Sequence, residues 1–534
     1  MAFNLVQAGS SLYSVNAAGG VSSALTLPTG VTLSDKRIPR FARFKRYVIV
    51  VNTPSRPISV DDTGTVRPLT PLPPTSTPVL AGETGGTLSG AFLAKQTFVF
   101  LDSAGNVIAE SDYGPLPILT VAAPAVTISA QYLRMTNLSL SPDTSAISGT
   151  RIYRTTKGPG AAYFQWLTIP GNTQTRVRDD KSDAALQVIA APTLGSAPDL
   201  TLVAEWQGRL WGVDRTGIDN LRYTEAGTAY AWSALNTLPI AHVGDDRFGI
   251  LGFAPRRETL GVGRQNRLVQ IAGNTRANIR PVGAIENCGF LSQESVVIYR
   301  DTVFFLWRDG VYQWDGDGLV CVSDKAGVGS WFKSNSFFNP SMFSQAFAVF
   351  DPLHLRYRLF LCSADSIVTN RWIEYSLKTG KFYGPHLTKA FVPTCALGIR
   401  GTDGQTHPMV GSREGSLSYD TFDRTDWEMF SIPMRVTTAG HDGGDPDHEK
   451  YFGQLSVHTE KESKGTLTTT PSVGDAETET VGEAMNYDLT QTRERLDRIG
   501  TGKEASLVFA NDELGQHVTI LGYQIDPVHV IGRR

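Results

Sequence analysis

The chain has 534 residues, of which 41% are hydrophobic, so it is long enough to form several hydrophobic cores. Its 49 basic and 52 acidic residues give a formal net charge of −3, which excludes a general electrostatic attraction to nucleic acid or to an anionic membrane. The 52 glycines and 29 prolines, with abundant Thr, Val and Tyr, favour strands joined by tight turns over helices. We therefore expect an all-β protein with several domains or a repeating architecture.

The amino-terminal segment, MAFNLVQAGSSLYSV, has neither the charged start nor the long apolar stretch of a secretory signal. No stretch of the sequence approaches the roughly 18 apolar residues of a membrane-spanning helix. These features predict a protein that is made in a cytoplasm and has no membrane span.

A hairpin pattern recurs along the chain: a strand, a turn with Gly or Asp, and a second strand of the form apolar-x-apolar. Its central positions are Leu12, Ile58, Leu221, Leu268, Val311, Ile373 and Leu417. Their separations are 46, 163, 47, 43, 62 and 44 residues, and four of the six agree closely. A period of this length is typical of β-propeller blades, which comprise four short strands and stack radially because one blade cannot bury both of its faces.

The segment from Asp35 to Arg46 interleaves basic and aromatic residues. Its cations are Lys36, Arg37, Arg40, Arg43, Lys45 and Arg46, and they stand among Pro39, Phe41 and Phe44. Such a pattern can contact a nucleic-acid backbone or an acidic neighbouring subunit. It is equally typical of an exposed connector in which the phenylalanines pack and the basic side chains remain in solvent.

The interval of 163 residues exceeds one period by about 118 residues, which is the size of one β-sandwich domain. A Pro/Thr-rich linker over residues 66–80 precedes a series of alternating, strand-like runs there. No cysteine pair bridges them, which favours a fibronectin-type over an immunoglobulin-like sandwich. We predict amino-terminal blades over residues 1–75, the inserted sandwich over 76–195, the remaining blades over 196–427 and a β-rich carboxy-terminal domain over 428–534.

The aromatic segment Val303–Val320 is predicted to supply core between blades, through Phe304, Phe305, Trp307, Tyr312 and Trp314. Asp309-Gly310 is expected to form a hairpin turn in which the glycine adopts a positive φ, and Gly208 and Gly415 are expected to do the same. The interval of 62 residues predicts a smaller insertion over residues 326–342. Its aromatic side chains form either core or a surface patch for a partner; they are Trp331, Phe332, Phe337 and Phe338.

The four cysteines lie far apart in strand-like segments, and we predict that they are buried free thiols of a reducing compartment; they are Cys288, Cys321, Cys362 and Cys395. No GxSxG, HExxH, P-loop or paired Cys and His pattern is present. We therefore expect no catalytic residue, no cofactor and no resident metal.

Two polar segments resemble cation sites. Residues 441–449 concentrate acidic and imidazole groups that could hold a divalent cation, although a polar loop is favoured; these are His441, Asp442, Asp445, Asp447, His448 and Glu449. The DGDG run at residues 315–318 predicts a turn, because the acidic ligand that a calcium loop needs further along is missing. Near the carboxy terminus a charged strand or helical turn is expected to expose Arg493, Arg495 and Arg498.

Four segments between residues 200 and 425 resemble, in order, the blades of tail nozzle or tail hub proteins of short-tailed bacteriophages, also called tail tubular protein B. They include LVAEWQGRLWGV, FGILGFAPRRETLGVGRQNRLVQIAG, GAIENCGFLSQESVVIYRDTVFFLWRDGVYQWDG and FDPLHLRYRLFLCS. The preceding GTRIYRTTKG and YFQWLTIPGNTQTRVRDD resemble the fibronectin-like insertion of phage tail proteins.

This resemblance implies a structural virion protein that is assembled in the host cytoplasm and located in the phage tail. Six copies would form a ring below the tail adaptor, extend the DNA channel, retain the packaged genome and permit its ejection. The implied partners are other copies of the chain, the adaptor ring, tail fibre or spike proteins and double-stranded DNA in passage, with no small-molecule substrate.

A channel for DNA should not grip phosphates, since each neutralised phosphate adds salt-dependent affinity that would slow passage. We therefore expect the segment from Lys36 to Arg46 to face another protein. Two alternatives remain open: a propeller that binds a surface glycan or receptor, and a propeller glycosidase or lyase that uses two carboxylates.

Overall fold

The computed structural model describes residues 4–17, 20–52, 56–101, 105–115, 118–119, 126–143, 148–157, 162–190, 197–240, 249–333, 337–388, 391–419, 426–427, 430–431, 434–474, 479–513 and 518–531. Strands dominate this part of the chain, and its two α-helices have four residues each. None of its helices is long and apolar enough to cross a membrane. The chain divides into two compact units, residues 1–307 with 312–320 and residues 308–311 with 321–534.

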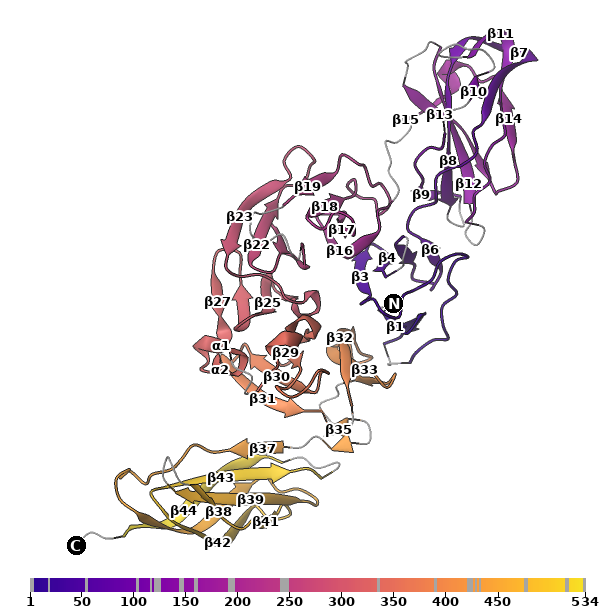
Figure 1. Ribbon diagram of the computed structural model, residues 1–534. Helices are drawn as coiled ribbons and strands as arrows, with labels where there is room; N and C mark the ends of the chain where they lie inside the picture. The colour runs from indigo at the N-terminus through magenta and orange to yellow at the C-terminus, as the bar shows by residue number, and fades with distance from the viewer. Residues whose placement is uncertain are drawn as a thin grey trace. The chain divides into compact units, whose positions relative to one another are not determined.

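Four antiparallel sheets of four strands each follow one another along the first unit (Figure 1). The first sheet contains β3 (Arg40–Phe44), β4 (Tyr47–Val51), β5 (Ile58–Val60) and β6 (Val66–Pro68). The second contains β16 (Leu200–Trp206), β17 (Arg209–Asp214), β18 (Asn220–Tyr223) and β19 (Thr237–Pro239). The third contains β20 (Gly252–Pro255), β21 (Leu260–Gly263), β22 (Arg267–Ala272) and β23 (Arg280–Glu286). The fourth follows η2 (Gln293–Ser295) and contains β24 (Val297–Tyr299), β25 (Thr302–Trp307), β26 (Gly310–Trp314) and β27 (Leu319–Cys321), with residues 308–311 and Cys321 grouped in the second unit.

The second unit continues with one antiparallel sheet of four strands and one of three strands. One contains β28 (Phe347–Asp351), β29 (Arg356–Leu361), β30 (Arg371–Ser376) and β31 (Lys381–Leu387). The other contains β32 (Pro393–Arg400), β33 (Thr406–Ser412) and β34 (Leu417–Tyr419). Their shared core includes Phe347, Phe360, Trp372 and Val410.

The predicted repeat is visible in these six sheets, because each repeat position from Ile58 onward lies on the third strand of its sheet. Ile58 is on β5 and Leu221 on β18, and the series continues with Leu268 on β22, Val311 on β26, Ile373 on β30 and Leu417 on β34. Leu12 differs. It lies on a separate two-stranded sheet of β1 (Asn4–Ala8) and β2 (Ser11–Val15), where its fully buried side chain packs against the first four-stranded sheet.

Adjacent sheets of the first unit bury a common apolar layer. Phe44 and Ile49 pack with Leu200 and Trp232 between the first and second sheets. The layer between the second and third sheets is formed by Trp206, Trp211, Tyr223, Phe253 and Val262. The chain is therefore all-β, with blades of the β-propeller type.

The predicted aromatic core is confirmed in the fourth sheet. Phe305 and Trp314 are fully buried and pack with Leu268 of the third sheet, while Phe304 is also buried. Trp307 and Tyr312 are part-buried and pack against the same cluster.

Polar contacts link these sheets where their first two strands turn. The Trp206 indole donates to the carbonyl of Arg256 at 2.7 Å, and the Gln207 amide donates to the carbonyl of Arg257 at 3.2 Å. One sheet further on, Arg256 Nη2 lies 2.9 Å from Asp301 Oδ2. Successive turns are thus bonded to one another.

A two-layered sandwich lies between the first and second four-stranded sheets in the chain order. One layer contains β10 (Ile118–Leu119), β7 (Val79–Phe92), β11 (Val126–Thr136) and β14 (Arg176–Asp179). The other contains β15 (Gln187–Ala190), β13 (Tyr163–Pro170), β12 (Ser148–Thr155), β8 (Ala94–Leu101) and β9 (Val107–Glu110), with η1 (Asp183–Ala185) before β15. Leu133, Met135, Ile152 and Trp166 fill the space between the layers.

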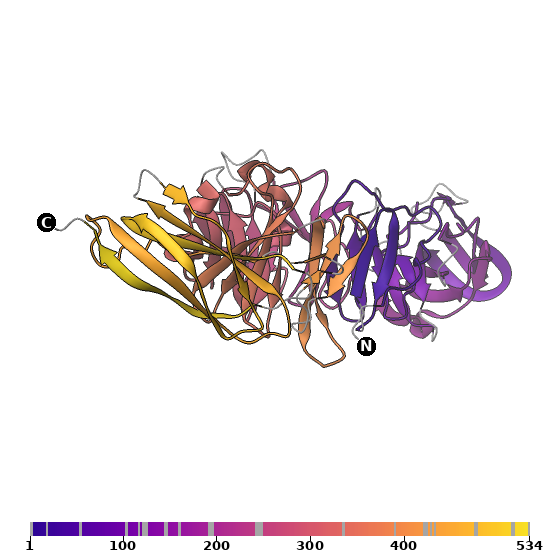
Figure 2. The same ribbon diagram turned by 90° about the horizontal axis from the view of Figure 1, so that it is seen from below.

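A second sandwich ends the chain (Figure 2, yellow). One layer contains β37 (Met434–Thr437), β43 (Glu504–Asn511), β39 (Thr466–Gly474), β40 (Glu479–Val481) and β41 (Met485–Asp488). The other contains β42 (Arg493–Gly502), β38 (Lys450–Thr459) and β44 (Ile520–Val530). The pair β35 (Asp426–Trp427) and β36 (Phe430–Ser431) precedes it. The charged segment predicted as a strand or helical turn is therefore the strand β42; Arg493 and Arg498 are exposed, and the side chain of Arg495 lies outside the described residues.

The prediction that Gly310 supplies a positive φ is wrong. The turn between β25 and β26 is formed by Arg308 and Asp309, and Gly310 is the first residue of β26. Its lack of a side chain serves close packing, because a Cβ atom there would lie 2.0 Å from the Ser323 hydroxyl oxygen. The other two predictions are confirmed, with φ of 67° at Gly208 and 87° at Gly415.

The segment predicted as the smaller insertion contains α2 (Ser330–Lys333) and the start of η3 (Pro340–Gln345), and α1 (Val322–Lys325) comes directly before it. Phe332 and Phe338 are fully buried with their ring centroids 5.4 Å apart, whereas Phe337 is 45% exposed. The aromatic residues of this segment therefore divide between core and surface.

The prediction for the cysteines is confirmed in part. All four are free, and Cys288 and Cys362 are buried. Cys321 is only part-buried and Cys395 is exposed, because they lie at the end of an outer strand and on a sheet face open to solvent.

Candidate contact surface on the basic hairpin

The basic segment forms the first hairpin of the first four-stranded sheet. Strands β3 and β4 pair from Arg40 opposite Val51 to Phe44 opposite Tyr47, and Lys45, with φ of 54°, begins the turn. Period-two alternation places Ala42 and Phe44 in the core. Phe41 and Arg43 consequently face solvent.

Arg40 is separated from the other cations of the hairpin. It forms an ion pair with Glu294 of η2, which precedes the fourth sheet, and its side chain is only 17% exposed. Burial lowers the pKa of Arg40 to about 10. This guanidinium is therefore committed to an internal contact between distant parts of the first unit.

Lys45 is also held in place, because its ammonium group donates to the carbonyl of Gly227, between β18 and β19 of the second sheet, at 2.6 Å. The Arg46 guanidinium donates to the Tyr47 hydroxyl at 2.9 Å and lies 5.1 Å from the centroid of that ring. Hydrogen bonding to Tyr47 raises the pKa of Arg46. These contacts fix the direction of both side chains without removing their charge.

Of the six predicted residues, the structure brings Arg43, Lys45 and Arg46 together at the turn and leaves Lys36 exposed on the segment before β3. Arg37 is part-buried on that segment, and Arg40 points to Glu294. The surface that remains is a small cationic ridge with the exposed ring of Phe41 beside it. It can bind carboxylates or phosphates of a partner.

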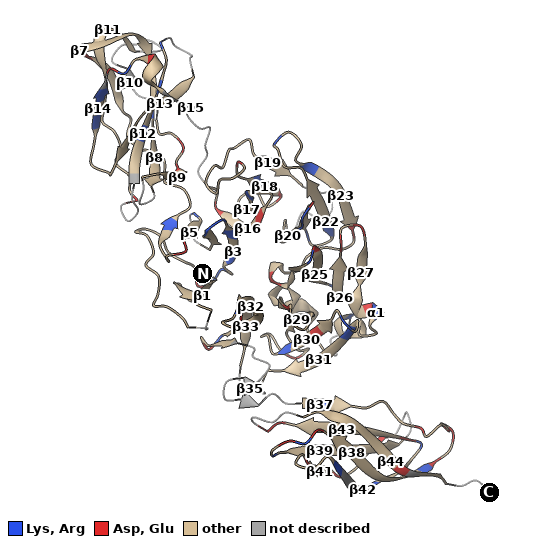
Figure 3. Cartoon of the chain, turned by 180° about the vertical axis from the view of Figure 1, so that it is seen from behind, with Lys and Arg blue, Asp and Glu red and all other residues tan. Residues whose placement is uncertain are grey.

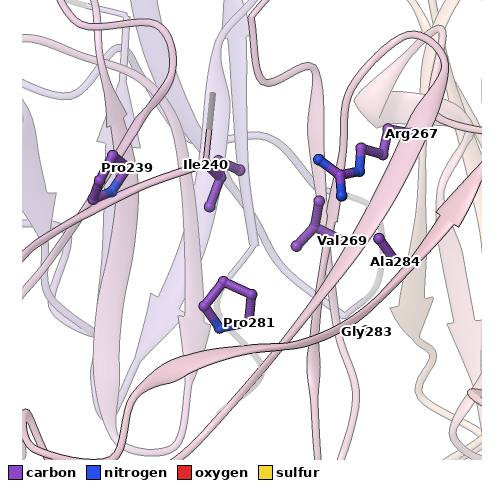
Figure 4. Close-up of a pocket in the computed structure, with 7 residues that line it drawn as sticks. All are labelled: Pro239, Ile240, Arg267, Val269, Pro281, Gly283 and Ala284. Atoms are coloured by element: carbon purple, nitrogen blue, oxygen red, sulfur yellow. The ribbon is translucent and has the colours of Figure 1, made fainter. Parts of the chain in front are cut away.

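A shallow cavity of about 370 Å³ lies between the second and third sheets (Figure 4). Pro239, Ile240, Val269 and Pro281 supply most of its wall, and Arg267 is its charged side chain. The Arg267 guanidinium lies 2.8 Å from Glu286 Oε1, so its charge is compensated. The cavity offers an apolar cleft, with no pair of carboxylates for sugar chemistry among its lining residues.

Within the described part of the chain, no group of three or more His, Cys, Asp or Glu side chains is placed to hold a metal ion. In the loop 441–449, Asp445 Oδ1 lies 2.8 Å from His448 Nδ1, and Asp442 accepts from the backbone amide of Gly444 at 2.9 Å. At residues 315–318 the Asp315 carboxylate accepts from the backbone amides of Asp317 and Gly318. Both segments use their carboxylates to shape turns.

A second cationic cluster, which was not predicted from the sequence, lies on the outer face of the first sandwich. Arg134 on β11 and Arg176 and Arg178 on β14 all approach the carboxylate of Glu83 on β7. Figure 3 shows β14 as a largely blue strand at the edge of this layer. The sequence signal for this cluster is the alternation of arginine with apolar residues, because it places the arginines on the face opposite the core. It occurs around Val177 in RVRD and between Leu133 and Met135 in LRM.

No protein-family model matches the sequence, and no curated protein matches it. Among solved structures, the chain is similar to BBS1N, solved in complex with ARL6DN, at 10% identity over 79% of this chain and 92% of that chain, with a TM-score of 0.26. It is also similar to Kluyvelomyces marxianus Hsv2, at 10% identity over 56% and 73% of the two chains, with a TM-score of 0.23. A third neighbour is an exo-β-1,3-galactanase from Phanerochaete chrysosporium, at 9% identity over 83% and 99%, with a TM-score of 0.22. At these values the neighbours carry no functional argument, and the fold class rests on the sheets of the chain itself.

Proposed function

We propose that this protein is a structural subunit of a short-tailed phage virion, and that six copies form a nozzle or hub ring that extends the tail DNA channel. The sequence resemblance over residues 200–425 motivates the proposal. Its structural support is a set of exposed apolar side chains on sheet edges, which a self-associating subunit requires.

The strand β44 is the clearest of these edges. It pairs with β38 on one side and is the last strand of its sheet in the described structure. Its exposed apolar residues include Leu521, which is 64% exposed, and Tyr523, and they continue with Val530 and Ile531. An edge with unpaired backbone groups and apolar side chains favours association with another chain.

A ring requires a second, different surface on each subunit, because head-to-tail contacts join unlike patches. In the first unit, the outer strand β23 is exposed over most of its length, and Val282 is 51% exposed. The cationic ridge of the basic hairpin is a further candidate for this role.

The test is the assembly state of the purified protein, measured by mass photometry and negative-stain electron microscopy over a range of concentrations. We expect rings of six subunits with a central hole wide enough for duplex DNA. The double variant Leu521→Asp/Tyr523→Asp should shift the population to smaller species. Ile367→Asp, at a loop position that is 70% exposed, is the matched control and should leave the rings intact. A monomer at every concentration would overturn the proposal, and turnover of a polysaccharide by that monomer would support the enzyme alternative.

A further inference from the structure

The cluster around Glu83 has an unusual composition for a sheet surface. Arg178 Nη1 lies 2.8 Å from Glu83 Oε1, Arg176 Nη2 lies 3.5 Å from the same oxygen, and Arg134 Nη1 lies 3.6 Å from Glu83 Oε2. The Arg178 guanidinium also lies over the Tyr132 ring, 5.2 Å from its centroid. Three cations thus share one anion, and two positive charges are left over.

The strand register makes this arrangement costly for folding. Arg134 and Arg178 stand directly opposite each other on β11 and β14. Like charges at opposed positions of neighbouring strands destabilise a sheet. The sandwich core gains nothing from them, because Leu133, Met135 and Val177 on the other face of the same strands supply its packing. A local arrangement that opposes folding is expected where a surface serves binding.

The three side chains remain open to solvent: Arg134 is 36%, Arg176 56% and Arg178 52% exposed. Each guanidinium presents five N–H donors in a fixed fork, and one carboxylate cannot accept from all of them. The contacts with Glu83 therefore indicate that the cluster recognises carboxylates. Most of its N–H donors remain available for a second carboxylate.

We propose that the face formed by Arg134, Arg176 and Arg178 is a docking site for an acidic peptide segment of a partner protein, with Glu83 competing for the same guanidinium groups. This inference goes beyond the proposed function and does not depend on it. The spare donors would bind Asp or Glu carboxylates as charge-assisted, bidentate pairs.

A peptide fits this face better than a nucleic acid does. Proteins that bind single-stranded nucleic acid place a row of cations along its phosphodiester backbone and provide aromatic rings on which the bases stack. Here the cations form one compact group around a carboxylate that would repel a continuous row of phosphates, and Tyr132 is already covered by Arg178. The net charge of −3 provides no wider field to attract a polyanion.

The test uses the full chain and a fluorescent oligo-glutamate peptide, followed by fluorescence anisotropy at low salt. We expect saturable binding that Arg134→Gln/Arg178→Gln weakens by about tenfold or more, since it removes two of the three guanidinium groups that form charge-assisted hydrogen bonds with the peptide. Glu83→Gln should increase the affinity for the peptide, because it removes the carboxylate that competes for the same guanidinium groups. Lys378→Gln/Arg413→Gln removes the same charge from exposed positions outside both cationic surfaces and should leave binding unchanged.

The melting temperature separates binding from folding. Removing the opposed like charges should leave it unchanged or raise it in Arg134→Gln/Arg178→Gln, so that lost binding reports on the site. The proposal is overturned if Lys378→Gln/Arg413→Gln and the cluster variant lose the peptide equally, if Glu83→Gln weakens binding, or if duplex DNA binds to this face in place of the peptide.

Discussion

Arg358 and Glu374 stand opposite each other on β29 and β30, where Arg358 Nη2 lies 2.7 Å from Glu374 Oε1 and both side chains are buried. A second guanidinium, that of Arg356, lies 2.6 Å from Glu374 Oε2. Burial acts to raise the pKa of the Glu374 carboxyl, but the two arginines outweigh it and hold the pKa below its usual value. The carboxylate is therefore a structural ion in the core of this sheet.

Glu374→Ala is expected to destabilise the second unit by about 3–5 kcal/mol, because it leaves the Arg358 charge buried without its partner. The measurement is the denaturant midpoint of the unfolding transition of this unit, followed by the fluorescence of Trp372, which packs against Arg358. Glu258→Ala, at a position 82% exposed, is the control and should change little. An equal shift for both variants would contradict the structural role.

The stability of the second unit should fall as the pH decreases from about 6.5 to about 4. Burial lowers the pKa of His386 from 6.5 to about 4. In that window the unfolded chain binds a proton that the folded chain does not, so unfolding is favoured as pH falls. The full shift corresponds to about 3 kcal/mol, an upper bound because the imidazole is part-exposed.

The matched variant for this pH dependence is His386→Phe. The ring centroids of His386 and Trp372 lie 4.0 Å apart, and phenylalanine keeps an aromatic ring in this contact. It should flatten the dependence of the melting temperature on pH, while His529→Phe at an exposed position should not. If the melting temperatures of the wild type and His386→Phe change with pH in parallel, the prediction is wrong.

Gly289→Ala is expected to lower the stability of the first unit by about 1–3 kcal/mol through overpacking. A Cβ atom at Gly289 would lie 1.9 Å from the carbonyl oxygen of Arg264, which is backbone and cannot move aside. At Gly283 the nearest atom would be 3.8 Å away, so Gly283→Ala is the control. Thermal unfolding of both variants checks the difference, and similar melting temperatures would count against the packing described here.

If the basic hairpin faces another protein, Lys36→Ala/Arg43→Ala/Arg46→Ala should weaken self-association and leave the affinity for duplex DNA unchanged. Mass photometry measures the first quantity, and anisotropy of labelled DNA as a function of salt measures the second. Lys378→Ala/Arg413→Ala/Lys464→Ala removes the same charge from other exposed positions. Loss of most of the salt-dependent DNA affinity in the hairpin variant alone would show that the ridge contacts DNA.

The blades could be predicted from the sequence because their signal is local. Positions such as Leu221 and Leu268 recur on third strands, where strand alternation and turn residues lie within a few positions of one another. Gly310 was misassigned because an Asp-Gly pair signals a turn, whereas close contact with Ser323 requires glycine for another reason. That contact cannot be read from neighbouring residues.

The site residues were harder to predict, because pairing across the fold decides which cations reach the surface. Arg40 looks like its neighbours in the sequence, yet it alone in the hairpin is bound by Glu294, which lies far along the chain. The cluster of Arg134 and Arg178 depends on the pairing of β11 with β14. Strand register of this kind is set by tertiary packing.

The amide of Ala197 donates to the Thr70 hydroxyl oxygen at 3.2 Å, and the chain between these residues contains the whole first sandwich. The polypeptide therefore leaves the first blade and returns to the second at nearly one point. A segment attached in this way can be exchanged, enlarged or replaced by a short linker without redirecting the flanking strands. The junction is a natural graft site, at which related chains could acquire different surface modules on a common scaffold.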